Sequence, residues 1–192
     1  MARARTPRQA WIDAGLRLLG ERGPEAVRVE VLARELGVTK GGFYGYFGDR
    51  PALLAEVLDE WERRSTTAVI DRAEAEGGDP LTKARRAASL TFADDLVPID
   101  LAVREWARRD DEVAARLRRV DNERMEYLRA TFRDRFPDPH DLEARCLLAF
   151  AGAIAGSLIV ADHPGQTRAQ VLERAASLVL GGSVAGPAPG GA

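Results

Sequence analysis

The sequence predicts an all-α protein. Glycine and proline divide its 192 residues into segments whose apolar residues recur at helical spacing. None of these segments has the alternating pattern of a half-buried β-strand. The length allows a sizeable buried core in one or two domains. We therefore expect about nine helices, with a small three-helix unit at the N-terminus and a larger helical domain after it.

The first three helices are short and closely spaced. The first is expected to begin at Thr6 and Pro7 and to end at Gly23. The second carries apolar residues at the i, i+3, i+4 and i+7 positions, namely Val29, Leu32, Ala33 and Leu36, before Gly37. Thr39 then resembles an N-cap, so a third helix is expected over residues 39–47. Two short helices joined by a tight, glycine-containing turn are typical of a helix-turn-helix.

The pattern of the rest of the chain predicts longer helices. Asp49 can cap a fourth helix with Pro51 in its first turn, and this helix is expected to run over residues 51–76. Further helices are expected over about 81–94, 99–109, 111–136, 138–161 and 167–180. Thr167 and Gln170 have the spacing of a capping box. The segment 183–192, SVAGPAPGGA, has little to bury and is expected to be a disordered tail.

Composition narrows the function classes. The single cysteine, Cys146, cannot form an internal disulfide, which favours the cytoplasm. The most apolar run, residues 146–161, is shorter than the roughly 20 residues that span a bilayer, so we expect no membrane segment. The net charge is −2, but the first fifty residues carry +3 and the remainder −5. An asymmetry of this kind is typical of a chain with one end facing nucleic acid.

The third helix has residues suited to DNA on its outer side. Phe43 and Phe47, four residues apart, are expected to face inward. Lys40 offers a mobile positive charge, and tyrosine hydroxyls can donate to phosphate oxygens. Glycine removes a side chain where the backbone must approach the duplex, although each glycine weakens a helix by up to about 1 kcal/mol. We therefore interpret the third helix as a recognition helix for the major groove.

These residues also carry a resemblance to a known family. The run VRVEVLARELGVTKGGFYGYFGDRPALLAEVLDEW resembles the DNA-binding domain of TetR/AcrR-type transcriptional regulators, and the match extends over about residues 8–61. The remaining two thirds is similar to that family only in architecture. Gly42 stands where serine or threonine is frequent in the family, and Gly45 where a large side chain is usual. Base readout by this helix is therefore expected to be sparse.

The resemblance implies a domain division and a function. Residues 1–50 would bind double-stranded DNA, residues 51–182 would bind a small-molecule effector and dimerise, and helix 51–76 would connect the two. The chain would be a homodimeric, ligand-responsive repressor of a palindromic operator. The expected DNA-binding residues are Arg28, Thr39, Lys40, Gly41, Gly42, Tyr44, Tyr46 and Arg50. The tyrosines could instead be half-buried packing residues, and the basic residues could be solvated surface charges.

Small and bulky apolar residues suggest a dimer interface and a pocket in the second domain. The expected interface residues are Ala149, Gly152, Ala153, Gly156, Val171, Ala175 and Leu178, from the last two helices of each subunit. The alternative is that the helix over 138–161 lies wholly inside one subunit. The expected pocket residues are Phe92, Trp106, Met125 and Phe150, which could also be plain core.

Other functions are less consistent with the sequence. His140, His163 and Cys146 do not share a helical face, so we expect no metal site. Residues suited to nucleophilic catalysis or to a phosphate loop are not arranged in a recognisable pattern, so we expect no enzymatic activity and no cofactor. Two alternatives stay open: a DNA-binding dimer without an effector, and a helical adaptor or enzyme in which the helix-turn-helix is incidental.

Overall fold

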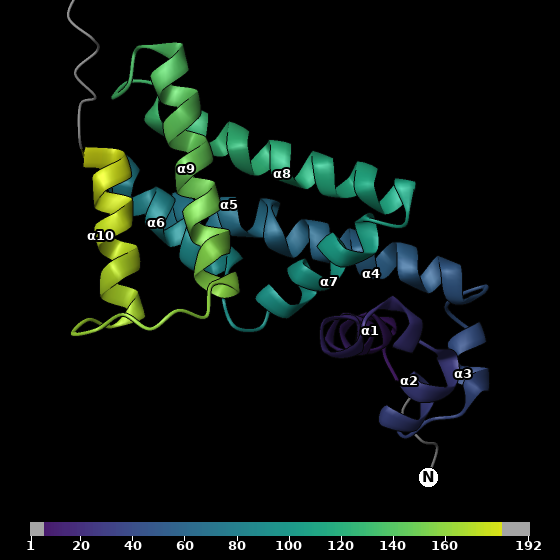
Figure 1. Cartoon of the computed structure of the whole chain (residues 1–192). Coiled ribbons are helices and arrows are strands. Elements are labelled where there is room, and N and C mark those ends of the chain that lie inside the picture. The colour runs from purple at the N-terminus through teal and green to yellow at the C-terminus, as the bar shows by residue number, and fades with distance from the viewer. Residues whose placement is uncertain (1–5, 182–192) are drawn as a thin grey trace, which may run out of the picture.

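The computed structural model describes residues 6–181, and the regular elements in that range are all helices (Figure 1). They are α1 (Arg8–Arg22), the short 3₁₀ helix η1 (Pro24–Ala26), α2 (Val29–Glu35), α3 (Lys40–Tyr44), α4 (Arg50–Ser65), α5 (Thr67–Ala75), α6 (Pro80–Thr91), α7 (Val97–Ala107), α8 (Asp111–Phe132), α9 (Pro139–Leu158) and α10 (Arg168–Gly181). The all-α prediction is confirmed. The tail predicted over residues 183–192 lies outside the described residues.

Side-chain caps start several helices where the sequence indicates them. Asp49 Oδ1 accepts a hydrogen bond of 2.8 Å from the Ala52 amide at the start of α4. The capping box before α10 is confirmed: the Thr167 amide donates to Gln170 Oε1 at 2.8 Å, and the Gln170 amide donates to Thr167 Oγ1 at 3.2 Å. These local signals explain why the predicted helix starts lie within a few residues of the observed ones.

The helix expected over residues 51–76 is in fact two helices, so that expectation is wrong. α4 ends at Ser65 and α5 begins after Thr66, whose backbone has φ −129° and ψ −88°. Ser65 Oγ donates to the Trp61 carbonyl at 2.6 Å, and Thr66 Oγ1 donates to the Glu62 carbonyl at 2.8 Å. Hydroxyl groups bonded to carbonyls one turn earlier compete with the helical ladder and bend it. Two such residues in succession therefore account for the break.

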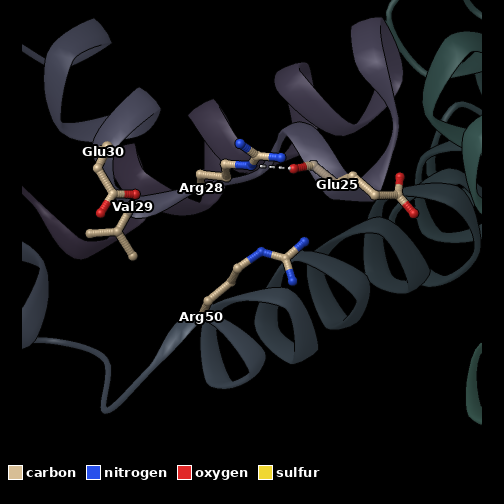
Figure 2. A pocket seen from close by; sticks show the side chains of 5 residues that line it. All are labelled: Glu25, Arg28, Val29, Glu30 and Arg50. Atoms are coloured by element: carbon tan, nitrogen blue, oxygen red, sulfur yellow. Dashed lines mark hydrogen bonds between the residues drawn. The ribbon is translucent and has the colours of Figure 1, made fainter.

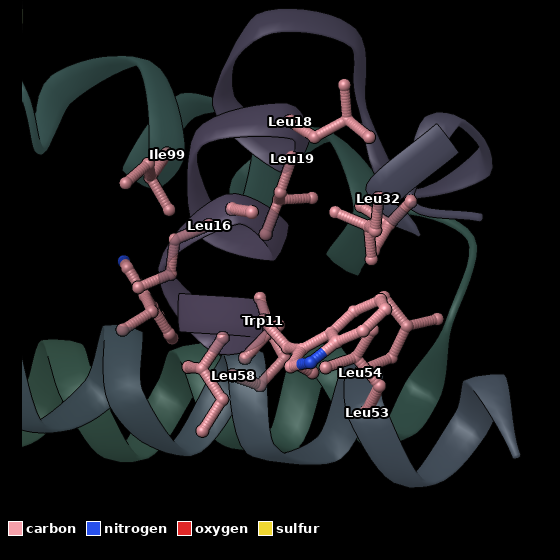
Figure 3. Close-up of a cluster of buried hydrophobic side chains, with 14 of the residues drawn as sticks. Trp11, Leu16, Leu18, Leu19, Leu32, Leu53, Leu54, Leu58 and Ile99 are labelled. Carbon is pink, nitrogen blue, oxygen red and sulfur yellow. The ribbon is translucent and has the colours of Figure 1, made fainter. Parts of the chain in front are cut away.

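One apolar core joins the N-terminal helices to α7 and α8 (Figure 3). Its buried members include Trp11, Leu19, Leu32, Phe43, Leu53, Val57 and Trp61 from α1–α4, Ile99 and Val103 from α7, and Val113 and Val120 from α8. The two parts approach closely at Gly20, where a Cβ would lie 3.0 Å from Ile99 Cγ1 and 3.3 Å from the Pro98 carbonyl carbon. This core contains residues from both sides of residue 50. The predicted boundary between a DNA-binding domain and an effector domain at that residue therefore stays a prediction.

The other end of the molecule has two smaller apolar clusters. One contains Met125, Phe132, Phe136, Cys146 and Leu180, and the other contains Val69, Ala73 and Ala87. Figure 1 shows α9 and α10 at the end away from α1–α3, with α4 and α8 running between the two ends. None of the described helices has both the length and the apolar character needed to cross a membrane.

Candidate nucleic-acid interface

The turn of residues 36–39 joins α2 to α3. Gly37 has a φ of +65°, a left-handed conformation that glycine adopts without strain. Its amide donates to the Arg34 carbonyl at 3.1 Å, and the Val38 amide donates to the Ala33 carbonyl at 2.9 Å. These bonds satisfy the last carbonyls of α2 and fix the direction in which the chain leaves it. The predicted helix-turn-helix is therefore present.

α3 is shorter than the predicted helix over residues 39–47. It ends at Tyr44, and the chain turns before Phe47. The inward orientation of the two phenylalanines is confirmed, because Phe43 and Phe47 are both buried. The Phe43 ring meets Trp11 of α1 edge-on at 5.5 Å between centroids and stacks on Phe47 at 5.2 Å. This aromatic cluster holds α3 against α1.

The opposite surface of α3 is open to solvent. Its exposed residues are Thr39, Lys40, Gly41 and Tyr44. Tyr44 is 62% exposed, far more than a packing residue would be. Gly42 and Tyr46 are half-buried at the edge of this surface, and a Cβ on Gly42 would lie 3.8 Å from Trp11 Cζ2. Four of the eight predicted DNA-binding residues are thus exposed on α3 or at its N-cap, and we call their combined surface the α3 face.

Lys40 is paired in the free protein. Its Nζ lies 2.6 Å from Oε1 of Glu30 in α2, and both side chains are more than half exposed. The hydrogen bond from Lys40 lowers the pKa of Glu30. An exposed pair of this kind contributes little to stability. Lys40 can therefore exchange Glu30 for a phosphate oxygen at small cost.

Arg28 and Arg50 lie beside a shallow hollow next to α2, together with Glu25, Val29 and Glu30 (Figure 2). Arg50 is half-buried, and its Nε donates to the Val27 carbonyl at 2.7 Å while its Nη2 donates to the Pro24 carbonyl at 2.5 Å. Arg28 is exposed and donates from Nε to the Glu25 carbonyl at 2.9 Å. Arg50 thus ties α4 to η1, a structural role that the sequence did not indicate.

A cavity of about 700 Å³ lies at the other end of the molecule, among α5, α6, α8, α9 and α10. Two of the four predicted pocket residues, Phe92 and Phe150, line it, with 6.4 Å between their ring centroids. Trp106 instead packs against the large core and donates from Nε1 to Asp110 at 3.2 Å. Met125 is buried in the cluster with Phe132. These two are not cavity residues because the helices that carry them turn those positions toward neighbouring helices.

Arg124, which lines the cavity, belongs to a charge network that extends away from the cavity wall. Arg124 of α8 is 7% exposed, and its Nη2 lies 2.9 Å from Oδ1 of Asp100, which is 1% exposed. Arg104 bonds to the other oxygen of Asp100 at 2.8 Å and to both oxygens of Asp121 at 2.9 and 2.7 Å. Burial lowers the pKa of Arg104, but the two aspartates outweigh it and raise the pKa overall. The sequence shows only that Asp100 and Arg104, and Asp121 and Arg124, are spaced for contact within one helix. It does not show that the two pairs meet or that they are buried.

The helix-turn-helix region resembles that of known regulators. The sequence profile described as "Bacterial regulatory proteins, tetR family" matches residues 12–57, which span the helix-turn-helix. The N-terminal part of this chain is therefore similar to the DNA-binding region of TetR-family regulators. YuxN of Bacillus subtilis (strain 168), an uncharacterized HTH-type transcriptional regulator, is 27% identical over 81 residues, 42% of this chain and 28% of that protein. The chain spans 28% to 40% of the length of the curated relatives that it matches.

Solved structures extend the likeness in fold over both ends of the chain. FadR from Bacillus subtilis, crystallised with stearoyl-CoA, has a TM-score of 0.68 at 17% identity and covers 92% of this chain and 100% of its own. AibR, crystallised with isovaleryl coenzyme A and operator DNA, has a TM-score of 0.63 at 14% identity and covers 90% and 97%. At such identities the likeness shows the fold alone.

The helices of the predicted dimer interface, α9 and α10, carry exposed residues, and the interface itself stays a prediction. Five of the seven predicted residues, Ala149, Gly152, Ala153, Gly156 and Ala175, line the cavity. Val171 is half-buried, and Leu178 is 64% exposed. Leu147 and Leu148 were not expected to be exposed, but they are 58% and 56% exposed on α9, and Leu148 also lines the cavity. Their only signal was the apolar run itself, which does not tell one face from another.

Proposed function

We propose that this chain is a transcription regulator that binds duplex DNA through the α3 face. The observation that carries the proposal is the combination of a buried Phe43 and an exposed Tyr44 on one short helix. Lys40 and Tyr44 supply a charge and a hydroxyl for phosphate oxygens, and the exposed glycine lets the backbone approach. Arg28 and Arg50 would contact the DNA backbone beside α2. The mechanism requires no catalysis, and the protein would act in the cytoplasm.

A homodimer is the proposed binding form. Large apolar side chains are exposed on α9 and α10, and Leu147, Leu158 and Leu178 are each more than half exposed. Exposed apolar side chains on two adjacent helices are suited to a symmetric four-helix contact with a second copy. Two-fold symmetry would then require a palindromic operator whose half-sites lie about 34 Å apart, or a multiple of that distance.

We further propose that a small molecule in the cavity controls DNA binding, with repression as the default action. The cavity volume of about 700 Å³ suits a drug-sized ligand. The bound coenzyme A esters of FadR and AibR support an effector site in this fold. Ser65 and Thr66, where α4 ends, line the cavity, so occupancy would move α4 and with it α3. A coupling of about 1–3 kcal/mol would change operator affinity about 5- to 150-fold.

The cavity also bears on the alternative of a DNA-binding dimer without an effector. Such a dimer has no need of a hollow among five helices, because an empty apolar cavity costs packing energy. We therefore favour the effector-responsive function. A helical adaptor or enzyme would leave the exposed surface of Lys40 and Tyr44 unexplained.

Selection of bound fragments from a genomic DNA library tests the proposal. The purified protein is expected to enrich a few fragments that share a palindrome, with two subunits, or a multiple of two, on each bound fragment. Native mass spectrometry of the complex gives the stoichiometry. Enrichment of no sequence, together with equal affinity for all fragments, would contradict a regulator.

A further inference from the structure

The wall of the cavity is mostly apolar and contains one buried cation. Val69, Ile70, Leu128 and Val179 are among its apolar residues. Its charged residues are Arg85, Asp94, Arg124 and Glu173, and of these only Arg124 is buried. Arg85, Asp94 and Glu173 are exposed to solvent, and together they carry two negative charges and one positive charge. The charges that line the cavity thus sum to zero.

The positive charge of Arg124 is already balanced inside the protein. Asp100 and Asp121 face Arg124 and Arg104 in a closed network of two cations and two anions. A carboxylate or phosphate placed next to this network would be an additional buried charge without a partner. Burying an unpaired charge is costly because water solvates it far better than an apolar wall does. The cavity is therefore poorly suited to an anion.

Arg124 nevertheless has hydrogen-bond donors to offer. A guanidinium carries five N–H groups. Within the described part of the chain, Arg124 Nε donates to the Ser65 carbonyl at 3.3 Å, Nη1 to Asp121 at 3.5 Å and Nη2 to Asp100 at 2.9 Å. These bonds use three of the five. The guanidinium carbon also lies 5.9 and 6.0 Å from the ring centroids of Phe92 and Phe150, two other cavity residues.

We propose that the cavity binds an uncharged, largely apolar molecule whose carbonyl oxygen accepts a hydrogen bond from Arg124. This inference rests on the proposed effector function, and it names the class of effector. Aliphatic or aromatic parts of the ligand lie against Phe92, Phe150 and the other apolar wall residues. Through Ser65 and Asp100, the same guanidinium contacts the end of α4 and the helix α7 that packs on α1. Arg124 is thus the specificity-determining residue of the site.

Fluorescence titration with Nile red tests the ligand class. Nile red is an uncharged aromatic dye with a carbonyl oxygen, and it brightens in apolar surroundings. Four competitors of matched chain length are compared: 2-dodecanone, n-dodecane, dodecanoate and dodecanoyl-CoA. We expect 2-dodecanone to displace the dye about 10-fold more tightly than n-dodecane, the value of one good hydrogen bond. Tighter displacement by dodecanoate or dodecanoyl-CoA would overturn the proposal, and so would equal displacement by the ketone and the alkane.

Two sets of variants locate the effect. Gly152 lines the cavity, and a Cβ there would meet no atom within 4 Å, so Gly152→Phe fills the cavity without a backbone clash. Gly181→Phe is the matched control, because Gly181 has equally open surroundings and does not line the cavity. Only Gly152→Phe should abolish Nile red binding. If both variants bind the dye as the unsubstituted protein does, the dye lies elsewhere and the proposal fails.

A double substitution tests Arg124 itself. Asp100→Asn with Arg124→Met keeps the network neutral and leaves the pair of Arg104 and Asp121 intact. The ratio between 2-dodecanone and n-dodecane should fall from about 10 to about 1, while Nile red still binds. An unchanged ratio would overturn the role of Arg124. DNA binding is measured separately: a protein that binds no operator refutes the proposed function, whereas one that binds its operator but shows no preference for the ketone refutes this inference alone.

Discussion

Two neighbouring glycines on α3 allow a matched test of how close the helix approaches DNA. Gly41 is exposed, and a Cβ there would lie 3.7 Å from Thr39 Oγ1. A Cβ on Gly42 would lie 3.8 Å from Trp11 Cζ2, on the side of the protein core. Both distances are ordinary van der Waals contacts, so neither alanine substitution strains the free protein. The two substitutions add the same methyl group in different directions, one beside exposed Thr39 and the other toward Trp11 of the core.

Both substitutions should stabilise the free protein by a similar amount. Glycine in a helix costs about 0.5–1 kcal/mol relative to alanine, so each change gains stability of that order. For a chain of this size, 1 kcal/mol corresponds to a shift in Tm of about 2–4 °C. The two variants should differ in operator affinity, which Gly41→Ala lowers and Gly42→Ala leaves nearly unchanged. If the Gly41 methyl breaks one contact in each subunit, at about 1 kcal/mol per contact, the dimer loses about 2 kcal/mol, or about 30-fold in affinity.

Fluorescence anisotropy on a labelled operator fragment, at one fixed salt concentration, measures the affinity, and calorimetry measures the Tm. Gly41→Ala should raise the Tm and weaken DNA binding, whereas Gly42→Ala should raise the Tm and leave DNA binding within about twofold. The reasoning is refuted if Gly41→Ala binds the operator as tightly as the unsubstituted protein. Equal weakening in both variants would refute it as well, because the methyl directions would then be irrelevant.

Three further predictions concern charge and burial. Glu30→Gln removes the partner of Lys40 and should strengthen DNA binding a few-fold at low salt, measured by the same anisotropy titration. Glu60 is bonded to Arg63 and Arg64, and the hydrogen bond from Arg63, opposed by burial, lowers the pKa of Glu60 from 4.5 to about 2. Its contribution to the free energy of unfolding, up to about 3 kcal/mol, is present above pH 4.5 and is lost as the pH falls through 2. Glu60→Gln should therefore lower the Tm at pH 7 about twice as much as at pH 3, where about half of the contribution is lost. Burial raises the pKa of the Cys146 thiol to about 11, so iodoacetamide should label native protein at pH 8 far more slowly than protein in urea, as followed by mass spectrometry.

Each of these has a clear contrary result. Unchanged or weaker DNA binding by Glu30→Gln would mean that Glu30 does not compete with phosphate for Lys40. A Tm difference for Glu60→Gln that is as large at pH 3 as at pH 7 would show that the carboxylate charge is not what stabilises α4. Equal labelling of Cys146 in native and unfolded protein would contradict its burial.

The N-terminal helices could be predicted from sequence because their signals are local. Gly37 ends α2 by adopting a positive φ, Asp49 caps α4 with its own side chain, and Phe43 and Phe47 are spaced for one face. Each of these depends on residues within one or two turns of helix. The same holds for the capping box of Thr167.

Features that depend on the conformation of a side chain, or on packing between distant helices, could not be predicted. The break at Ser65 and Thr66 was missed because hydroxyl residues are compatible with a helix until their side chains bond to the backbone. The bonds of Arg50 to η1 span more than twenty residues of sequence. Gly152, which was expected at a dimer surface, lines the cavity, and apolar periodicity on α9 does not tell a cavity from an interface.

The central claim is that Lys40 and Tyr44 contact DNA, and one titration tests it most directly. The double variant Lys40→Ala, Tyr44→Ala removes exposed groups, so its stability should change by no more than about 0.5 kcal/mol. Its affinity for the selected operator, measured across a range of salt concentrations, should fall by at least about 100-fold. The salt slope should fall by about 2, because the dimer loses two lysine contacts with phosphate. A folded double variant with unchanged affinity and an unchanged salt slope would contradict the account.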